Sequence, residues 1–109
     1  MTRGDTIIVS LAGDFGKPRP AIVIQSDRLI GLQTVIVCPL TTTILESLPL
    51  RPVFEPDAAN GLRVRSQAMI DRLMTSRLTR VGSVIGRMSD ADMAKLDRML
   101  GFVLGFRER

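Results

Sequence analysis

The chain carries side chains suited to holding an anion close to hydroxyl groups. Arg19 stands between Pro18 and Pro20, and proline fixes its own φ while pushing the residue before it toward extended backbone. We therefore expect the Arg19 guanidinium on a stiff, extended segment, where its planar fork suits bidentate contact with phosphate. A second segment, residues 38–43, ends in three threonines, and a third, residues 65–71, contains Arg-Ser-Gln and then Ile-Asp.

Missing residue types narrow the chemistry. The 109 residues include no histidine and one cysteine, Cys38. Zinc sites need several His or Cys ligands, and Ser-His, Cys-His and paired-histidine mechanisms need an imidazole, so we expect none of these, no metal and no cofactor. A lone cysteine in an apolar run is expected to be a buried hydrophobe, and the lack of disulfides suits a reducing cytoplasm. Residues 1–5 do not resemble a secretory signal, and no apolar run approaches the ~20 residues of a membrane span.

Positive charge is concentrated in one stretch of the sequence. Lys+Arg number 15 and Asp+Glu 11, a net charge of +4. Residues 61–88 hold six arginines and one acidic residue, whereas the residues before them are slightly acidic and those after them are balanced. Such a stretch is typical of a surface that binds nucleic acid or another polyanion. Alternatively, the arginines reflect codon preference in a GC-rich genome and are merely solvated.

Short strands followed by one helix are expected to position these side chains. Apolar and β-branched runs predict strands at residues 6–10, 21–25, 34–40, 50–55, 62–70 and 78–86. Pro39 should end the third strand or confine it to a sheet edge. Asn60-Gly61 is a hairpin-turn signal. The alternation within 62–70 predicts a strand that presents Arg63 and Arg65 on one face.

The helix has start and stop signals of its own. Ser89, followed by Asp90 and Asp92, is typical of an N-cap with acidic residues in the first turn. An apolar stripe with helical spacing follows and reaches Leu104, and Gly105 is the expected stop. The fold class we expect is mainly β with a C-terminal helix, a strongly bent sheet or barrel forming a single domain over residues 1–109.

Five segments taken together resemble the MazF/PemK toxins of bacterial toxin–antitoxin modules. They are TRGD at 2–5, KPRPAIVIQSD at 17–27, VCPLTT at 37–42, SQAMID at 66–71 and VGSVIGRMSD at 81–90. Each segment alone is a weak signal. Their shared order and compatible spacing extend the resemblance over nearly the whole chain.

The resemblance implies an SH3-like barrel that acts as a homodimer. It implies a sequence-specific, metal-independent endoribonuclease that cleaves single-stranded RNA, especially mRNA, and halts translation. It also implies a cognate antitoxin whose disordered acidic tail crosses the RNA groove. RNA can be cut without a metal if its own 2′-OH attacks the adjacent phosphate, and the protein must then stabilise the phosphate charge and move two protons.

The resemblance also assigns candidate site residues. Arg19 would clamp the phosphate and donate a proton to the leaving oxygen, and Thr41 would hydrogen-bond the phosphate or orient the 2′-OH. Asp71 stands at the position of a catalytic acid in some members. The candidate RNA-binding residues are polar or basic neighbours of these three, namely Lys17, Thr42, Arg63, Arg65, Ser66 and Gln67.

One departure from the family keeps other functions open. Ala68 and Met69 stand where the arginine partner of Asp71 would be sought, so Arg65 or Arg72 would have to replace it. The related CcdB toxins share the fold and inhibit DNA gyrase without catalysis, but they use a terminal Trp-Gly-Ile and this chain contains no Trp. A barrel that binds RNA or antitoxin without cutting is the other alternative.

Overall fold

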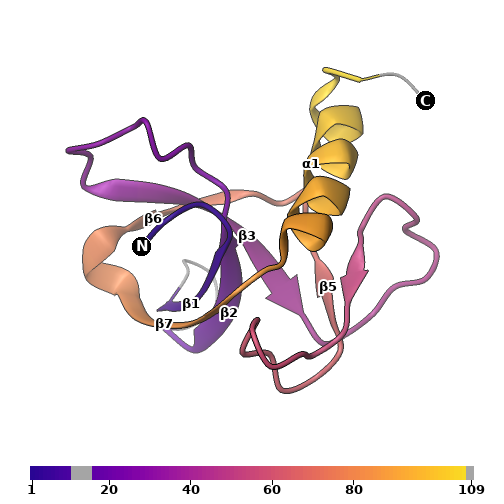
Figure 1. Ribbon diagram of the computed structural model, residues 1–109, viewed down its shortest axis with the longest axis horizontal. Helices are drawn as coiled ribbons and strands as arrows, with labels where there is room; N and C mark the ends of the chain where they lie inside the picture. Colours follow the sequence, from indigo (N-terminus) through magenta and orange to yellow (C-terminus); the bar gives the residue numbers. More distant parts are fainter. Residues whose placement is uncertain (11–15, 108–109) are drawn as a thin grey trace.

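One curled antiparallel sheet forms most of the molecule (Figure 1). The structure, a computed structural model, describes residues 1–10 and 16–107. Its strands are β1 (Asp5–Ser10), β2 (Pro18–Val23), β3 (Thr34–Thr41), β4 (Val53–Phe54), β5 (Ser66–Ala68), β6 (Met74–Arg77) and β7 (Val81–Arg87). The order in the sheet is β4-β5-β3-β2-β1-β7, and β6 also pairs with β3. A 3₁₀ turn, Leu78–Arg80, leads from β6 into β7. Because β6 pairs with β3 and β7 pairs with β1, this turn carries the chain back to the first strand.

The two faces of the sheet carry two separate apolar cores. Successive strand residues point to opposite faces, so Ala21 and Val23 lie in one cluster and Ile22 in the other. The inner cluster comes from β1, β2 and β3, with Met74 of β6 and Val81 of β7 packed against it. The outer cluster fills the space between the sheet, the β4–β5 pair and the helix.

The helix α1 (Asp90–Leu104) forms as its local signals predict. The Ser89 side chain accepts a hydrogen bond from the Asp92 N–H at 3.0 Å, and Gly105 ends the helix in the left-handed conformation, with φ +82°. Leu96 and Leu100 are buried in the outer cluster, where α1 stands beside β5 (Figure 1). No helix among the described residues is long and apolar enough to cross a bilayer. The expected fold class, mainly β with a C-terminal helix, is confirmed.

The prediction for Pro39 was wrong. β3 runs through Pro39, which is buried, and lies between β2 and the β5 and β6 strands. On the far side from β2, β3 pairs with β6 over residues 34–37 and with β5 over residues 40–41. Pro39 falls between these two partners, so its missing N–H interrupts neither ladder, and its carbonyl still accepts a hydrogen bond from the Met69 N–H at 2.9 Å.

The second half of the sheet also differs from the sequence-based expectation. Only residues 66–68 of the alternating 62–70 run form a strand, and Val64, which lies outside it, is 54% exposed. Asn60-Gly61 lies inside a long connection between β4 and β5 rather than in a tight hairpin turn. The strand β6 was not predicted at all, and β7 begins three residues later than the expected strand.

The connection between β4 and β5 packs backbone against backbone on β7. A Cβ added at Gly61 would collide with the Ile85 carbonyl, and one added at Gly86 would collide with the Ala59 carbonyl. Main chain of the connection therefore rests directly on main chain of β7.

Candidate functional site

Arg19 and Thr41 share one face where β2 and β3 meet. The β2–β3 pairing runs from Val23–Val37 to Ala21–Pro39. Continuing that antiparallel register by two residues brings Arg19 opposite Thr41, with both on the inner-cluster side of the sheet. Arg19 is exposed, and Thr41 is half-buried. An arginine beside a hydroxyl at the end of two strands is an arrangement that can bind a phosphate.

The loop after Thr41 is fastened by the buried amide of Gln67. Gln67 is paired with Thr41 across β3 and β5 and is almost fully buried. Its Oε1 accepts from the Leu45 N–H at 3.0 Å, and its Nε2 donates to the carbonyls of Leu45 and Arg51 at 3.1 and 3.2 Å. With these bonds the Gln67 side chain has little left to offer RNA. Ser66 is also buried, and its hydroxyl donates to the Val64 carbonyl at 2.8 Å.

Asp71 is held by Arg51, a residue that the sequence reasoning missed. Arg51 Nε and Nη2 donate to the two carboxylate oxygens of Asp71 at 2.7 and 3.1 Å. The Arg51 side chain is 6% exposed and that of Asp71 is 48% exposed. Hydrogen bonding from Arg51 lowers the pKa of Asp71, so the carboxylate stays ionised. Neither Arg65 nor Arg72 is the partner found here. The only sequence signal for Arg51 was a charge inside the apolar run Leu-Pro-Leu-Arg-Pro-Val-Phe.

Cys38 is buried as predicted and lies close to this ion pair. Burial raises the pKa of the thiol to about 12, and the negative charge of Asp71 adds to the effect. The thiol is therefore neutral at physiological pH and has no nucleophilic character.

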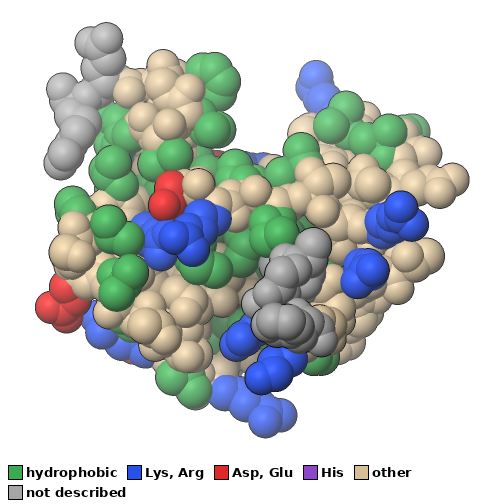
Figure 2. Space-filling model, turned by 180° about the vertical axis from the view of Figure 1, so that it is seen from behind, with side chains coloured by type: hydrophobic (Ala, Val, Ile, Leu, Met, Phe, Trp, Pro, Cys, Tyr) green, Lys and Arg blue, Asp and Glu red, His purple; other side chains and the backbone are tan. Residues whose placement is uncertain are grey.

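The arginines of the basic stretch differ in how far they are neutralised. Arg65 Nε donates to Glu55 at 2.7 Å, and Arg87 Nη1 contacts Asp5 at 3.2 Å. Arg63 has no carboxylate partner among residues 1–10 and 16–107, and Lys17 is likewise exposed without one. Figure 2 shows Lys and Arg side chains along the lower edge and right-hand lobe of the rear face, where Asp and Glu are sparse. Positive charge on this surface is therefore only partly balanced.

A hollow of about 640 Å³ adjoins the ends of β2 and β3. Pro20 and Thr42, the neighbours of Arg19 and Thr41, form part of its wall. Its other lining residues come from β1, β5, β7 and the connection between β4 and β5, namely Ile8, Gly61, Leu62, Arg63, Val64, Ser66, Ser83 and Ile85. The structure thus brings Thr42, Arg63 and Ser66 together, and leaves Arg65 and Asp71 outside this hollow.

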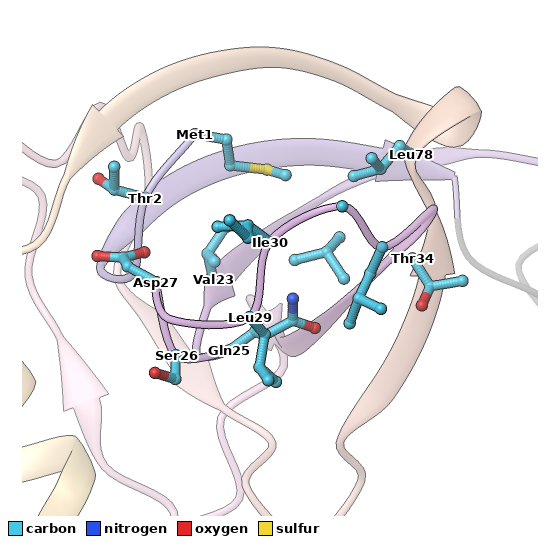
Figure 3. A pocket seen from close by; sticks show the side chains of 13 residues that line it. Met1, Thr2, Val23, Gln25, Ser26, Asp27, Leu29, Ile30, Thr34 and Leu78 are labelled. Atoms are coloured by element: carbon cyan, nitrogen blue, oxygen red, sulfur yellow. The ribbon is translucent and has the colours of Figure 1, made fainter.

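A second hollow, of about 290 Å³, lies at the other end of the same strands. Figure 3 shows Met1, Val23, Ile30 and Leu78 gathered around it, with Ser26 and Asp27 at one side. No Lys or Arg is among its lining residues, and apolar side chains predominate. Its chemistry is therefore unsuited to a phosphate chain.

The comparison with protein families identifies the family of this chain and the activity of that family. Residues 2–104 match the model of the PemK-like, MazF-like toxins of type II toxin–antitoxin systems. This chain belongs to the PemK/MazF toxin family. The family is one of RNA-cleaving toxins, which agrees with the expected endoribonuclease and not with a gyrase inhibitor.

Relatives of the PemK/MazF chain support the same assignment. A "Probable endoribonuclease MazF" of Mycolicibacterium smegmatis is 38% identical over 96% of this chain and 97% of its own length. The solved Mycobacterium tuberculosis toxin MazF-mt6 superposes with a TM-score of 0.78 at 25% identity, covering 93% of this chain and 96% of that one. A mycobacterial endoribonuclease solved in complex with its cognate antitoxin has a TM-score of 0.82 at 21% identity and covers 100% and 99% of the two chains, which supports the fold.

Proposed function

We propose that this chain is the toxin of a toxin–antitoxin pair and cuts single-stranded RNA, mRNA above all, at specific sequences and without a metal. The observation that carries the proposal is the β2–β3 register, whose continuation by two residues beyond Ala21–Pro39 sets Arg19 opposite Thr41. In this proposal residues 1–109 act as one domain in the cytoplasm. The endoribonuclease relatives support the proposed activity.

The proposed reaction is an attack of the RNA 2′-oxygen on the adjacent phosphorus. The 2′-O–P bond forms and the P–O5′ bond breaks, while one proton leaves the 2′-OH and one reaches O5′. The products are a 2′,3′-cyclic phosphate and a 5′-OH, and no co-reactant is consumed. Arg19 stabilises the charge on the phosphate oxygens, and the Thr41 hydroxyl orients the 2′-OH or binds the phosphate. Arg19 is exposed, so its planar guanidinium is accessible to a phosphate and can donate hydrogen bonds to it.

The remaining candidate residues take supporting roles in this proposal. Lys17, Thr42 and Arg63 contact the RNA chain on either side of the cut. Gln67 and Ser66 act as positioning residues, since both are buried and bonded to backbone groups. Asp71 acts through Arg51, whose carbonyl is one of the groups that Gln67 holds. Arg65, paired with Glu55, adds only long-range attraction for RNA.

The proposed partners are single-stranded RNA, a second copy of the chain and a cognate antitoxin. A disordered acidic antitoxin tail would compete with RNA for the same unneutralised cations, because both are polyanions. The mycobacterial endoribonuclease solved with its cognate antitoxin supports this pairing for the present chain.

A cleavage assay in EDTA tests the proposed reaction. Wild type incubated with mixed-sequence RNA should give fragments with 2′,3′-cyclic phosphate ends, and Arg19→Ala should slow cleavage about 10²–10³-fold, the usual loss for one charge-stabilising donor. Arg28→Ala, which removes an exposed arginine beyond the opposite end of β2, is the matched control and should cut like wild type. Equal rates for wild type and Arg19→Ala would refute the catalytic assignment. RNA binding without any cut would favour the non-catalytic barrel.

A further inference from the structure

A third hollow, of about 250 Å³, lies between the helix and the connection from β3 to β4. Apolar side chains form most of its walls, with Leu48 and Leu50 from that connection and Val103 from α1. Arg51 and Asp71, which are hydrogen-bonded to each other, are the only charged residues among its described lining residues. Sites for drug-sized ligands are larger, with volumes of about 300–1,000 Å³. This hollow therefore has the size for one side chain rather than for a whole small molecule.

The connection that forms one wall is fixed before any partner binds. The Arg51 N–H donates to the Leu48 carbonyl and the Leu48 N–H to the Leu45 carbonyl, each at 3.1 Å. The buried Gln67 amide holds both ends of this double turn, at the Leu45 main chain and at the Arg51 carbonyl. A surface fixed in this way loses little conformational entropy on binding.

The ion pair leaves hydrogen-bonding capacity at the hollow. Arg51 donates to Asp71 through Nε and Nη2, and no described residue accepts from its Nη1. That nitrogen is not sealed inside the protein, because Thr6 Oγ1 is the only enclosed side-chain atom without a partner in residues 1–10 and 16–107. The Asp71 side chain is 48% exposed, and a carboxylate has about four acceptor sites, more than Arg51 uses. The pair can therefore offer a partner both a donor and an acceptor.

The charges at this hollow argue against RNA as its occupant. The Arg51 and Asp71 charges cancel, so a phosphate that approached the guanidinium would also meet the carboxylate. An acidic peptide is unsuited for the same reason. A neutral peptide main chain offers one C=O acceptor and one N–H donor per residue, which matches the Nη1 donor and the remaining Asp71 acceptor. An apolar side chain on the same residue would be removed from water by the apolar walls.

We propose that this hollow binds one apolar residue from an extended, uncharged segment of a partner protein. Arg51 Nη1 donates to the carbonyl of that residue and the Asp71 carboxylate accepts from its N–H, while the apolar walls enclose its side chain. The site is separate from the Arg19–Thr41 pair, neither member of which lines the hollow. Such a surface goes beyond the proposed function, because the binding does not depend on RNA cleavage.

A titration followed by NMR tests this assignment. The probe is the neutral peptide acetyl-Gly-Leu-Gly-amide, added to the ¹⁵N-labelled full chain, and acetyl-Gly-Gly-Gly-amide is the matched probe without the apolar side chain. The leucine probe should shift the amide signals of Leu50, Ile70 and Val103, with a Kd on the order of 1 mM for so small a contact. The glycine probe should bind at least about 10-fold more weakly, because the burial of the leucine side chain is lost.

Two substitutions locate the binding surface. Leu48→Ser removes part of an apolar wall at a residue that is 37% exposed, and it should weaken binding of the leucine probe about 10-fold. Leu78→Ser is the matched control, since Leu78 is 42% exposed and lines the hollow at the other end of the β2–β3 ladder. It should leave the Kd unchanged. The comparison of the two probes on wild type needs no variant and holds even if one variant fails to fold.

The outcomes separate this inference from the proposed function. Equal affinity for the two probes, or an equal loss of binding in Leu48→Ser and Leu78→Ser, would overturn the peptide site. A 2′-O-methyl RNA, which lacks the attacking hydroxyl, should leave the bound leucine probe in place, and displacement of the probe would assign the hollow to RNA instead. A wild type that binds neither probe and dissociates into smaller species on Leu48→Ser would assign the wall to a second copy of the chain. Undiminished cutting by Arg19→Ala would overturn the catalytic roles and leave this site standing.

Discussion

The two ends of the β2–β3 ladder differ in chemistry although the same strands build both. At one end stand Arg19 and Thr41, and a hollow on the opposite face of the sheet there is lined by Arg63, which has no carboxylate partner in the described part of the chain. At the other end, Val23 and Thr34 border a mainly apolar hollow without a lining Lys or Arg. Strand residues advance about 3.3 Å each, so Thr34 and Thr41 are separated by about 23 Å along β3. One ladder therefore keeps the surface that we propose binds RNA separate from an apolar surface, and the contrast can be tested by paired substitutions.

The largest contrast is expected between the two threonines of β3. Thr41→Val should slow RNA cleavage about 10- to 100-fold, because it removes the hydroxyl that we propose contacts the phosphate or the 2′-OH. Thr34→Val removes the corresponding hydroxyl at the apolar end and should leave the rate within about 2-fold of wild type. Thr41→Ser should retain most activity. Initial rates on one RNA substrate compare the three variants, and similar rates for Thr41→Val and Thr34→Val would remove the functional distinction between the ends.

Gln67→Leu is expected to produce the next largest effect. The substitution leaves the Leu45 and Arg51 backbone groups without their buried partners, and each unsatisfied group costs about 1–3 kcal/mol. We expect the free energy of unfolding, measured with urea, to fall by about 2–4 kcal/mol. In the remaining folded fraction KM for RNA should rise, because Thr42 and the loop after it are no longer fixed. A stability loss with unchanged KM would limit Gln67 to a purely structural role.

Asp71→Asn should have a smaller, pH-dependent effect. The Asp71 pKa is lowered in the folded state, so its pairing with Arg51 stabilises the protein above the ordinary aspartate pKa and is lost as pH falls through about 4 and below. The free energy of unfolding of the variant should be about 1–2 kcal/mol lower than that of wild type near pH 7. This loss is smaller than for a fully buried pair, because Asp71 is half exposed. The difference between wild type and variant should shrink in denaturation curves taken toward pH 3.

The same variant also separates two roles for Asp71. A residue that acts only through Arg51 should change cleavage less than 10-fold once the folded fraction is corrected. A decrease beyond 100-fold would instead support direct acid–base catalysis by this carboxylate.

Ile30→Ser should have the smallest effect, because it changes the apolar end alone. Ile30 is 84% exposed at the margin of the hollow in Figure 3. We expect stability to change by less than about 0.5 kcal/mol and cleavage to stay within 2-fold. Thermal melts and the same initial-rate assay provide the measurement, and a cleavage defect would show that RNA also reaches this end.

Local signals in the sequence were sufficient for some elements but not for others. Ser89 and Gly105 mark the helix by contacts within a few residues, so its bounds could be predicted from neighbouring positions alone. The strands β4, β5 and β6 are two to four residues long and exist because β3 supplies partners on its far side. Their own sequences contain too little alternation to show this, and Pro39 concealed the central position of β3.

The residues of the candidate site also differ in whether the sequence alone could predict them. Arg19 and Thr41 could be singled out because prolines and a run of hydroxyls mark them in the chain. The buried amide of Gln67 and the Arg51–Asp71 pair could not, since burial depends on segments distant in sequence. The alternation rule placed Arg63 and Arg65 on one face, but residues 62–65 are not a strand, and the two arginines have different surroundings.

The contact of Gly61 and Gly86 with opposing backbone has a consequence for diversification. Because main chain rests on main chain there, the anchorage places no demand on the identity of the side chains at positions 63–65. The side chains at positions 63–65 can therefore vary while the connection between β4 and β5 stays attached to β7.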